Sequence, residues 1–289
     1  MIPLLIGIPA VLAVLFQFVR NEKARGYIVY AGAGIIMFTT VMFVVQWITA
    51  GAQKQMFYPE TELIDHLMTV GDIFLMCLII WLSVKYGKIL PIILSVVQTA
   101  VVLYTEFTSE VAEAPHMMVD WLTILMCIII AFIGGFICIY TVGYMKGYHK
   151  HHTEVKDRQP FFFSMLFLFL AAMFGLVLSQ NLIWIYFFWE ITSVISFLMI
   201  GYTRTEEAVN NSFCALWMNL LGGLGFAVAI AIMAQISGSL QLIHVVEVGA
   251  PLPLMCLALA GMTKSAQLPF STWLLGAMVA PTPSSALLH

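Results

Sequence analysis

The sequence predicts an all-α, polytopic membrane protein with about nine or ten transmembrane helices, and two observations support this. Hydrophobic residues make up 62% of the chain and charged residues only 9%, whereas a soluble domain carries roughly 25% charged residues. Apolar runs of roughly 20 residues recur from one end of the chain to the other, and each could cross a hydrocarbon core about 30 Å thick. Such a chain is not an ordinary globular protein.

The apolar runs define the expected spans in chain order. The N-terminal run lacks the basic segment and the small-residue cleavage site of a signal peptide, so we read it as a first span. A final piece, 271–289, turns at Pro281 and Pro283. We expect spans at 2–19, 27–49, 67–84, 89–106, 121–144, 161–179, 181–201, 212–235 and 252–270.

Charged residues in the loops alternate in sign along the chain. Ten of the twelve basic residues lie in the segments 20–25, 85–88 and 146–159 or at Arg204. Basic loops tend to stay on the cytoplasmic side of a membrane, so we expect an outside N-terminus and cytoplasmic basic loops. The intervening loops hold one base, Lys54, and the acidic residues Glu60, Glu62, Asp65, Glu106, Glu110, Glu113, Asp120 and Glu247.

The cysteines and histidines do not predict a metal or redox centre in this chain. All five cysteines lie inside apolar runs without CxxC spacing, whereas zinc and iron–sulfur sites need closely spaced pairs. The tract HKHH at 149–152 has a metal-binding composition, but its place in a basic loop favours solvated side chains. We expect no cofactor bound by these residues.

Glu190 is an ionisable residue deep inside a span. It lies nine residues after Asn181 in NLIWIYFFWEITSVISFLMIG, which corresponds to a depth of about 13 Å. A charge at the bilayer centre costs about 2.5–3.5 kcal/mol on insertion scales, and such residues usually mark ion pathways or pair with one another. Ser193 lies about one turn further along the same face.

Lys264 offers a positive charge at a comparable depth. It follows Pro253 by eleven residues, or about 16 Å of helix. Two opposite charges at matching depth predict either a proton relay or a static buried pair that only fixes helix packing. A buried pair by itself is weak evidence for stability.

The residues around Lys264 favour the relay. Pro269 removes a backbone donor and clashes with the carbonyl one turn earlier, so we expect the helix to break after the lysine. Broken helices at membrane depth are tolerated where they line a wet cavity, and Thr263, Ser265 and Gln267 add polar groups there. Burial makes a lysine release its proton more easily and a nearby carboxylate opposes this, so a lysine with a movable carboxylate partner can load and release a proton.

Asp72 is the remaining carboxylate inside a span. It lies only about five residues into the span 67–84, where the interface is within reach and the cost of a charge is smaller. This position favours a polar contact at a helix end over a place in an ion pathway.

Two long segments resemble one known family of membrane proteins. The stretch SQNLIWIYFFWEITSVISFLMIGY resembles the fifth-helix glutamate motif of the antiporter-like, proton-translocating subunits, and TKSAQLPFSTWLLGAMVAPTPSSALLH resembles their broken seventh helix and the start of the eighth. The family comprises subunits of respiratory complex I (NADH:quinone oxidoreductase), of multisubunit Mrp cation/proton antiporters and of energy-converting nickel–iron (NiFe) hydrogenases. The resemblance is good from about Asp120 to His289. The segments NLLGGLGF and FFFSMLFLFLAAMFGLVLSQNLIWIYFFWE favour the hydrogenase (Ech-type) branch.

The resemblance implies roles for three residues and an organisation for the chain. Glu190 matches the family's glutamate, Lys264 its lysine, and His289 the histidine that passes protons from the first half-channel toward the second. The family has two inverted five-helix repeats, each with a broken helix, and it continues beyond the point that matches His289, so we expect the N-terminal part of a longer subunit. The expected domains are N-terminal helices at 1–118 with an additional hairpin at 67–106, a first antiporter-like repeat (half-channel) at 119–280, and the start of a further helix at 281–289.

The resemblance therefore implies a subunit, not itself catalytic, that translocates protons or exchanges them for sodium in a prokaryotic cell membrane. We expect it to belong to an energy-converting hydrogenase, in which partner subunits carry the Ni–Fe and Fe–S centres and a peripheral redox module drives pumping. The alternatives are a subunit of an Mrp-type Na⁺/H⁺ antiporter and an antiporter-like subunit of complex I. A passive membrane anchor is disfavoured, because a scaffold gains nothing from two costly buried charges.

Overall fold

The computed structural model describes residues 1–58, 62–109 and 115–289 and confirms an all-α, polytopic membrane protein. The sequence predictions for Glu60, Glu110 and Glu113, and for the side chain of Glu62, lie outside the described part. Seven of the described helices are long and apolar enough to cross a membrane, and two shorter apolar helices, Ile2–Phe18 and Pro251–Lys264, accompany them.

The elements follow the predicted spans closely. In chain order they are α1 (Ile2–Phe18), α2 (Glu22–Thr49), β1 (Gln55–Phe57), α3 (Glu62–Lys85), α4 (Ile89–Thr108), β2 (Met117–Val119), α5 (Trp121–Ile129), α6 (Gly135–His151), α7 (Gln159–Leu178), α8 (Leu182–Ile200), α9 (Glu206–Ser237), α10 (Leu242–Val248), α11 (Pro251–Lys264), α12 (Thr272–Gly276) and α13 (Thr282–Leu288). A π-helical turn, Ile130–Gly134, joins α5 to α6 in one continuous span.

Some features of the structure were not predicted from the apolar runs. Strands β1 and β2 pair antiparallel, with Gln55 opposite Val119 and Phe57 opposite Met117. The predicted span 252–270 is shorter in the structure, because α11 ends at Lys264 and the chain continues through turns to α12. The span predicted to begin at residue 67 begins five residues earlier, at Glu62.

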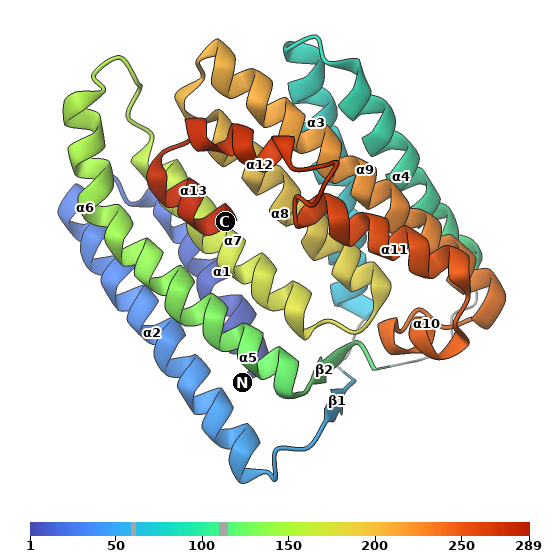
Figure 1. Ribbon diagram of the computed structural model, residues 1–289. Helices are drawn as coiled ribbons and strands as arrows, with labels where there is room; N and C mark the ends of the chain where they lie inside the picture. The colour runs from blue at the N-terminus through green and yellow to red at the C-terminus, as the bar shows by residue number, and fades with distance from the viewer. Residues whose placement is uncertain (59–61, 110–114) are drawn as a thin grey trace.

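Helices α7, α8 and α9 form the centre of the molecule (Figure 1). On one side α1 packs against α7, where Phe16 contacts the rings of Phe163 and Phe167 at centroid distances of 5.9 and 5.1 Å. On the other side α4 and α11 both pack against α9, and α3 packs against α8 and α4. The α3–α4 hairpin therefore covers the face of α8 and α9 that α1 and α2 leave open.

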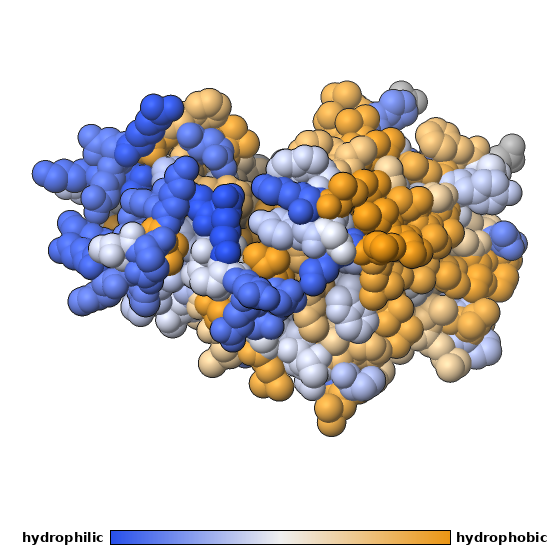
Figure 2. All heavy atoms as spheres, turned by 90° about the horizontal axis from the view of Figure 1, so that it is seen from above, coloured by the Kyte–Doolittle hydropathy of each residue, from blue (hydrophilic) through white to orange (hydrophobic). Residues whose placement is uncertain are grey.

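The basic loops gather at one end of the helices, the top of Figure 1, and β1, β2 and α10 lie at the other end. Seen from the basic end, hydrophilic residues collect mainly over the side where the loop after α6 lies (Figure 2). The alternation of charge along the sequence thus corresponds to two physically opposite ends of the molecule.

Candidate ion-translocation site

The carboxyl group of Glu190 lies buried at the centre of the helix bundle. Its side chain sits midway along α8 and is only 3% exposed. The oxygen Oε1 is buried and has no hydrogen-bond partner among the described residues. A buried carboxyl oxygen without a donor costs free energy, and such unsatisfied groups often mark functional sites in native structures.

A glycine on α9 creates the space that Glu190 occupies. A Cβ atom at Gly223 would lie 2.7 Å from Oε1 of Glu190 and 2.6 Å from Oε1 of Gln98 on α4. Both distances are below 3.0 Å, so a side chain at this position would displace the end of Glu190 and that of Gln98. Gly223 thus lets the end of Glu190 and the amide of Gln98 meet against the α9 backbone, so the α3–α4 hairpin contributes to this site.

Lys264, at the last residue of α11, points at the helix turn that carries Glu190. Its Nζ donates a hydrogen bond to Oγ of Ser193 at 2.9 Å and to the carbonyl of Trp189 at 3.4 Å. The ammonium group also lies 5.0 Å from the centroid of the Trp189 ring, within the range of a cation–π interaction. These contacts fix Lys264 at the depth of Glu190, as the sequence predicted.

Glu190 and Lys264 are neighbours but not a closed ion pair. Among the residues that the structure describes, the ion pairs within 4.0 Å do not include this one. Their charges are nevertheless close enough to interact. The lysine is held by neutral acceptors, and Oε1 of Glu190 has no donor among the described residues.

The helix break leaves carbonyl groups that one tryptophan helps to satisfy. The last turn of a helix leaves carbonyl oxygens without intrahelical partners. Trp273 of α12 donates its indole N–H to the carbonyl of Thr263 at 2.9 Å, and Ala266 has a positive φ of 53°. Pro269 follows within the turns of this break. The chain thus folds back on itself beside Lys264.

The α9 helix approaches α11 closely through further glycines. A Cβ atom at Gly222 would lie 2.0 Å from Oγ1 of Thr263, and one at Gly225 would lie 2.9 Å from the carbonyl oxygen of Cys256. The segment NLLGGLGF therefore holds the broken helix close to α9 while Gly223 accommodates Glu190. The glycines are needed for packing at the site.

The structure corrects the expectation for Asp72. Because α3 starts at Glu62, Asp72 lies ten residues into the helix and is only 6% exposed, with a buried Oδ1 that lacks a partner in the described part of the chain. Helix α3 packs against α8, which carries Glu190, and against α4. Asp72 is therefore a second buried carboxylate near the site and not a contact at a helix end.

Asp72 belongs to a polar face of α3 that leads toward the site. Asp65, Thr69 and Asp72 recur at intervals of four and three residues, which places them on one side of a helix. Asp65 accepts a hydrogen bond from the indole of Trp184 at 2.7 Å, and Thr69 donates one to Glu106 of α4 at 2.7 Å. The face runs from the end opposite the basic loops toward Glu190.

The other predicted residues divide into two groups. Ser193 and Thr263 lie at the site, whereas Ser265 and Gln267 are exposed in and after the break, with Ser265 donating to the carbonyl of Gly261. His289 is exposed on α13, and its ring contacts Ser285, 2.8 Å from that residue's carbonyl oxygen. No contact among the described residues joins His289 to Lys264.

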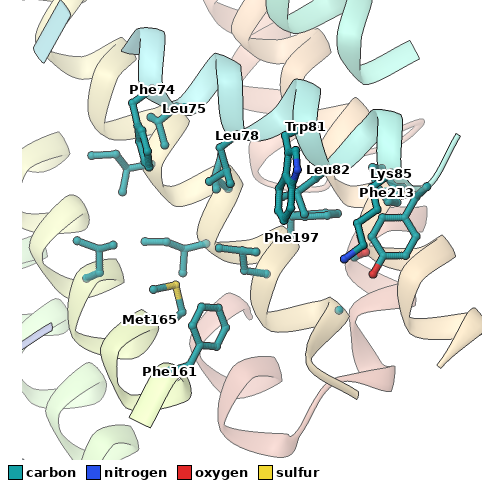
Figure 3. Close-up of a pocket in the computed structure, with 18 of the residues that line it drawn as sticks. Phe74, Leu75, Leu78, Trp81, Leu82, Lys85, Phe161, Met165, Phe197 and Phe213 are labelled. Carbon is teal, nitrogen blue, oxygen red and sulfur yellow. The ribbon is translucent and has the colours of Figure 1, made fainter. Parts of the chain in front are cut away.

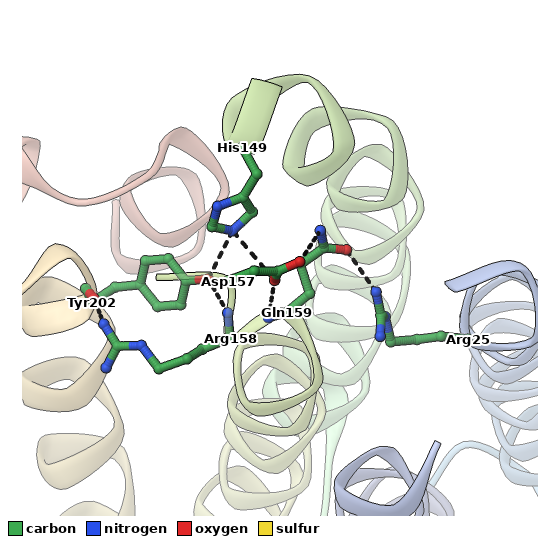
Figure 4. A network of polar contacts seen from close by, with 6 residues as sticks. All are labelled: Arg25, His149, Asp157, Arg158, Gln159 and Tyr202. Atoms are coloured by element: carbon green, nitrogen blue, oxygen red, sulfur yellow. Dashed lines mark hydrogen bonds and ion pairs between the residues drawn. The ribbon is translucent and has the colours of Figure 1, made fainter. Parts of the chain in front are cut away.

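The histidine-rich tract at 149–152, expected in a loop, lies mostly in the last turn of α6 and joins a separate polar network at the basic end (Figure 4). His149 Nε2 lies 3.1 Å from the Tyr202 hydroxyl and 3.6 Å from a carboxylate oxygen of Asp157. Gln159 accepts a hydrogen bond from Arg25 at 2.7 Å. The described residues contain no cluster of three or more His, Cys, Asp or Glu side chains that could hold a metal ion, and this network ties α2, α6, α7 and α8 together.

The fold and the site define a class of protein. A polytopic helical membrane protein that holds a buried glutamate and a partly buried lysine next to a broken helix has the features of a membrane ion translocator. The profile described as NADH:quinone oxidoreductase/Mrp antiporter, TM, matches residues 179–289, and that described as NADH-Ubiquinone oxidoreductase (complex I), chain 5 N-terminus, matches residues 114–153. The chain is an antiporter-like membrane subunit of the complex I/Mrp family.

The relatives include bacterial antiporter subunits. The chain is 32% identical over 219 residues to the A1 subunit of a Na(+)/H(+) antiporter of Staphylococcus haemolyticus, and the match covers 69% of this chain and 26% of that protein. It is 35% identical over 189 residues to the A/B subunit of a probable K(+)/H(+) antiporter of Rhizobium meliloti, and the match covers 60% of this chain and 19% of that protein. The matched part is thus about a fifth to a quarter of each relative.

The fold also occurs in an archaeal respiratory complex. A chain of the membrane-bound sulfane sulfur reductase matches with a TM-score of 0.70 at 14% identity, covering 98% of this chain and 49% of that chain. At this identity the match shows the fold alone.

Proposed function

We propose that this chain translocates protons across the membrane, coupled to the movement of a monovalent cation or to a redox reaction, as one subunit of a multisubunit membrane complex. The observation that carries the proposal is the placement of Lys264, at the end of a broken helix, against the turn of α8 that holds buried Glu190. Two charges at this depth are costly, and they are retained in membrane proteins mainly where ions pass.

Each residue of the site has a role in the proposed path. Lys264 is the proton carrier, Glu190 sets how firmly the lysine holds its proton, and Ser193 is the neutral acceptor that holds the lysine between transfers. The polar groups of Thr263, Ser265 and Gln267, with the break at Pro269, hold water beside the lysine. His289 passes the proton onward from this half-channel, which corresponds to residues 119–280.

The polar face of α3 is the proposed entry to the site. Asp65, Glu106 and Asp72 form a series of acidic groups that starts at the end opposite the basic loops. Acidic side chains that line a membrane path concentrate cations and protons locally. A proton or sodium ion would reach Glu190 along this face, with Gln98 beside it.

The type of complex is proposed from the relatives. Their names as subunits of Na⁺/H⁺ and K⁺/H⁺ antiporters support an antiporter complex in which this chain exchanges a cation for protons. An energy-converting hydrogenase is the second candidate, favoured by the glycine-rich segment 219–226, and there partner subunits would supply Ni–Fe and Fe–S centres and a peripheral redox module. Both types imply further membrane subunits as partners.

The membrane orientation follows from charge. The basic loops at one end of the molecule would face the cytoplasm of a prokaryotic cell and the N-terminus would face outside. The acidic face of α3 would then open toward the outside, where cations and protons enter in an import process.

Reconstituted vesicles test the proposed function. The protein, purified from membranes with its bound subunits, is placed in vesicles that contain a pH-sensitive dye, and sodium or potassium chloride is then added outside. The proposal predicts that one of the cations makes the interior more alkaline, because each entering cation expels protons. If neither cation has an effect and no attached redox reaction moves protons either, the chain is not an ion-translocating subunit.

The composition of the purified complex separates the two candidates. Mass spectrometry of the co-purifying subunits, with nickel and iron analysis of the same sample, distinguishes membrane subunits alone from a hydrogenase module. Partners confined to other membrane subunits, without stoichiometric nickel, support the antiporter. A nickel–iron subunit pair in stoichiometric amounts supports the hydrogenase and contradicts the antiporter.

A further inference from the structure

A long apolar groove lies between α3 and helices α7, α8 and α9 (Figure 3). Its volume is about 640 Å³. Phe74, Leu78 and Trp81 of α3 line one wall and Phe161 and Met165 of α7 line the other. Phe74 and Trp81 are 64% and 60% exposed, so protein does not fill this space in the part of the chain that the structure describes.

The groove has the dimensions of a lipid chain. Its lining on α3 runs from Gly71 to Lys85, and fourteen residues of helix rise about 21 Å. One leaflet contributes about half of a hydrocarbon core that is about 30 Å thick. The groove therefore extends from the basic end of the molecule past the depth that a single leaflet occupies.

Only one end of the groove is charged, and all of that charge is positive. Lys85 at the end of α3, Arg158 before α7 and Arg204 after α8 are the charged residues in its lining. The ion pairs observed among the described residues all involve other bases. None of these three cations therefore has a described carboxylate oxygen within 4.0 Å.

Arg158 is in an unfavourable electrostatic environment. Burial lowers the pKa of its guanidinium, and so does the positive charge of Arg204. Arg158 donates one hydrogen bond to the carbonyl of Tyr202, but its Nε is buried and has no partner among the described residues. Lys85 lies over the rings of Trp81 and Tyr86, an arrangement typical of a membrane interface. An anion at this end would relieve the repulsion.

We propose that the groove binds one anionic glycerophospholipid, with an acyl chain between α3 and α7–α8 and its phosphate among Lys85, Arg158 and Arg204. A small soluble anion would leave the apolar walls uncovered, and a neutral lipid or an apolar partner helix would leave three cations uncompensated. The bound lipid supports α3, in whose membrane-spanning stretch only 22% of the residues are buried in protein. The end of the acyl chain lies beside Gly71, next to Asp72.

Photo-crosslinking tests the site in the full chain with its bound subunits. The protein is reconstituted with phosphatidylglycerol or phosphatidylcholine that carries the same photoreactive acyl chain, and adducts are mapped by mass spectrometry. We expect phosphatidylglycerol to label α3, α7 and α8 at the groove at least about five-fold more than phosphatidylcholine, since each basic residue at a membrane surface contributes about that factor. Labelling of the exposed face of α2 serves as an internal reference for bulk lipid.

Three variants distinguish a built site from ordinary bilayer contact. Lys85→Gln with Arg204→Gln should reduce the excess of phosphatidylglycerol labelling over phosphatidylcholine labelling at least about five-fold, and Leu78→Trp should reduce labelling by both lipids by filling the groove. Lys23→Gln removes an exposed basic residue from the same end and should change neither. Equal labelling by the two lipids, labelling unaffected by the paired substitutions, or crosslinks from the groove to another subunit would each overturn the proposal.

Discussion

The central helices and the α3–α4 hairpin shield their buried carboxyl groups in different ways. In the membrane-spanning stretch of α8, 78% of the residues are buried inside the protein. Glu190 lies there against Gly223. In α3 the corresponding share is 22%, yet Asp72 on that helix is buried, with 6% of its surface exposed. The central bundle shields its carboxylate by packing on all sides, whereas the hairpin shields its carboxylate with one face only.

This difference indicates how the two regions contribute to the proposed path. The central site is fixed by close helix contacts that permit few alternatives, so changes there should affect both stability and transport strongly. The hairpin presents its polar face toward the site and its apolar face to the membrane, so changes there should alter the supply of ions with less effect on the fold. The predictions below compare the two regions directly.

The largest effect is expected for Glu190→Gln in the central bundle. The substitution keeps the shape of the side chain but removes its charge and its ability to exchange a proton, which contributes about 10²-fold in many proton-transfer steps. We expect proton movement in vesicles to fall by about 10²-fold while the complex still assembles. Glu247→Gln, an exposed glutamate on α10, is the matched control. A Glu190→Gln rate within two-fold of the control would remove Glu190 from the path.

Gly223→Ala should have the next largest effect, and it acts on packing. The new methyl group would lie within 2.7 Å of Glu190 and Gln98, and overpacking of this kind costs about 1–3 kcal/mol. Thermal unfolding in detergent should therefore occur at a lower temperature than in the unsubstituted protein. Gly34→Ala, in α2 with no atom within 4 Å of the added carbon, should leave the unfolding temperature unchanged. Equal temperatures for the two variants would mean that the ends of Glu190 and Gln98 are not packed tightly against Gly223.

A smaller effect is expected for Asp72→Asn in the hairpin. Asp72 is buried in α3, which packs against α8, and we expect its interaction with Glu190 to contribute about 1 kcal/mol, or about a five-fold change in transport rate. The half-maximal cation concentration should rise, and the unfolding temperature should not fall, because the substitution removes a buried carboxyl group whose Oδ1 has no partner among the described residues. Glu22→Gln removes an exposed carboxylate at the opposite end and is the control. A rate loss as large as that of Glu190→Gln would erase the distinction between the two regions.

Predictions from the sequence were most accurate for features that the geometry of a single helix determines, such as the depth of a residue in the membrane. The rise per residue fixes how deep Glu190 and Lys264 lie, so their matching depth could be predicted, and a proline fixes where α11 can continue. The same arithmetic placed Ser193 about one turn from Glu190, but its hydrogen bond with Lys264 is known only from the structure.

Contacts between distant helices were harder to predict. Gln98 and Trp273 carry no signal in their own segments, because their roles depend on how α4 and α12 rotate against α9 and α11. Asp72 was misplaced because an apolar run does not show the first, polar turn of α3. The glycines at 219–226 indicated a family branch in the sequence, and only the structure shows which atoms they make room for.

The most direct test of the account is transport by Lys264→Ala in the assembled complex. Vesicles containing this variant are compared with vesicles containing Lys54→Ala, which removes an exposed lysine from the loop between α2 and β1. Subunit composition is checked by mass spectrometry of the same samples. We predict that Lys264→Ala assembles normally but moves protons no faster than protein-free vesicles, while Lys54→Ala retains full activity. Unchanged proton movement by an assembled Lys264→Ala complex would contradict the central claim that this lysine carries the translocated proton.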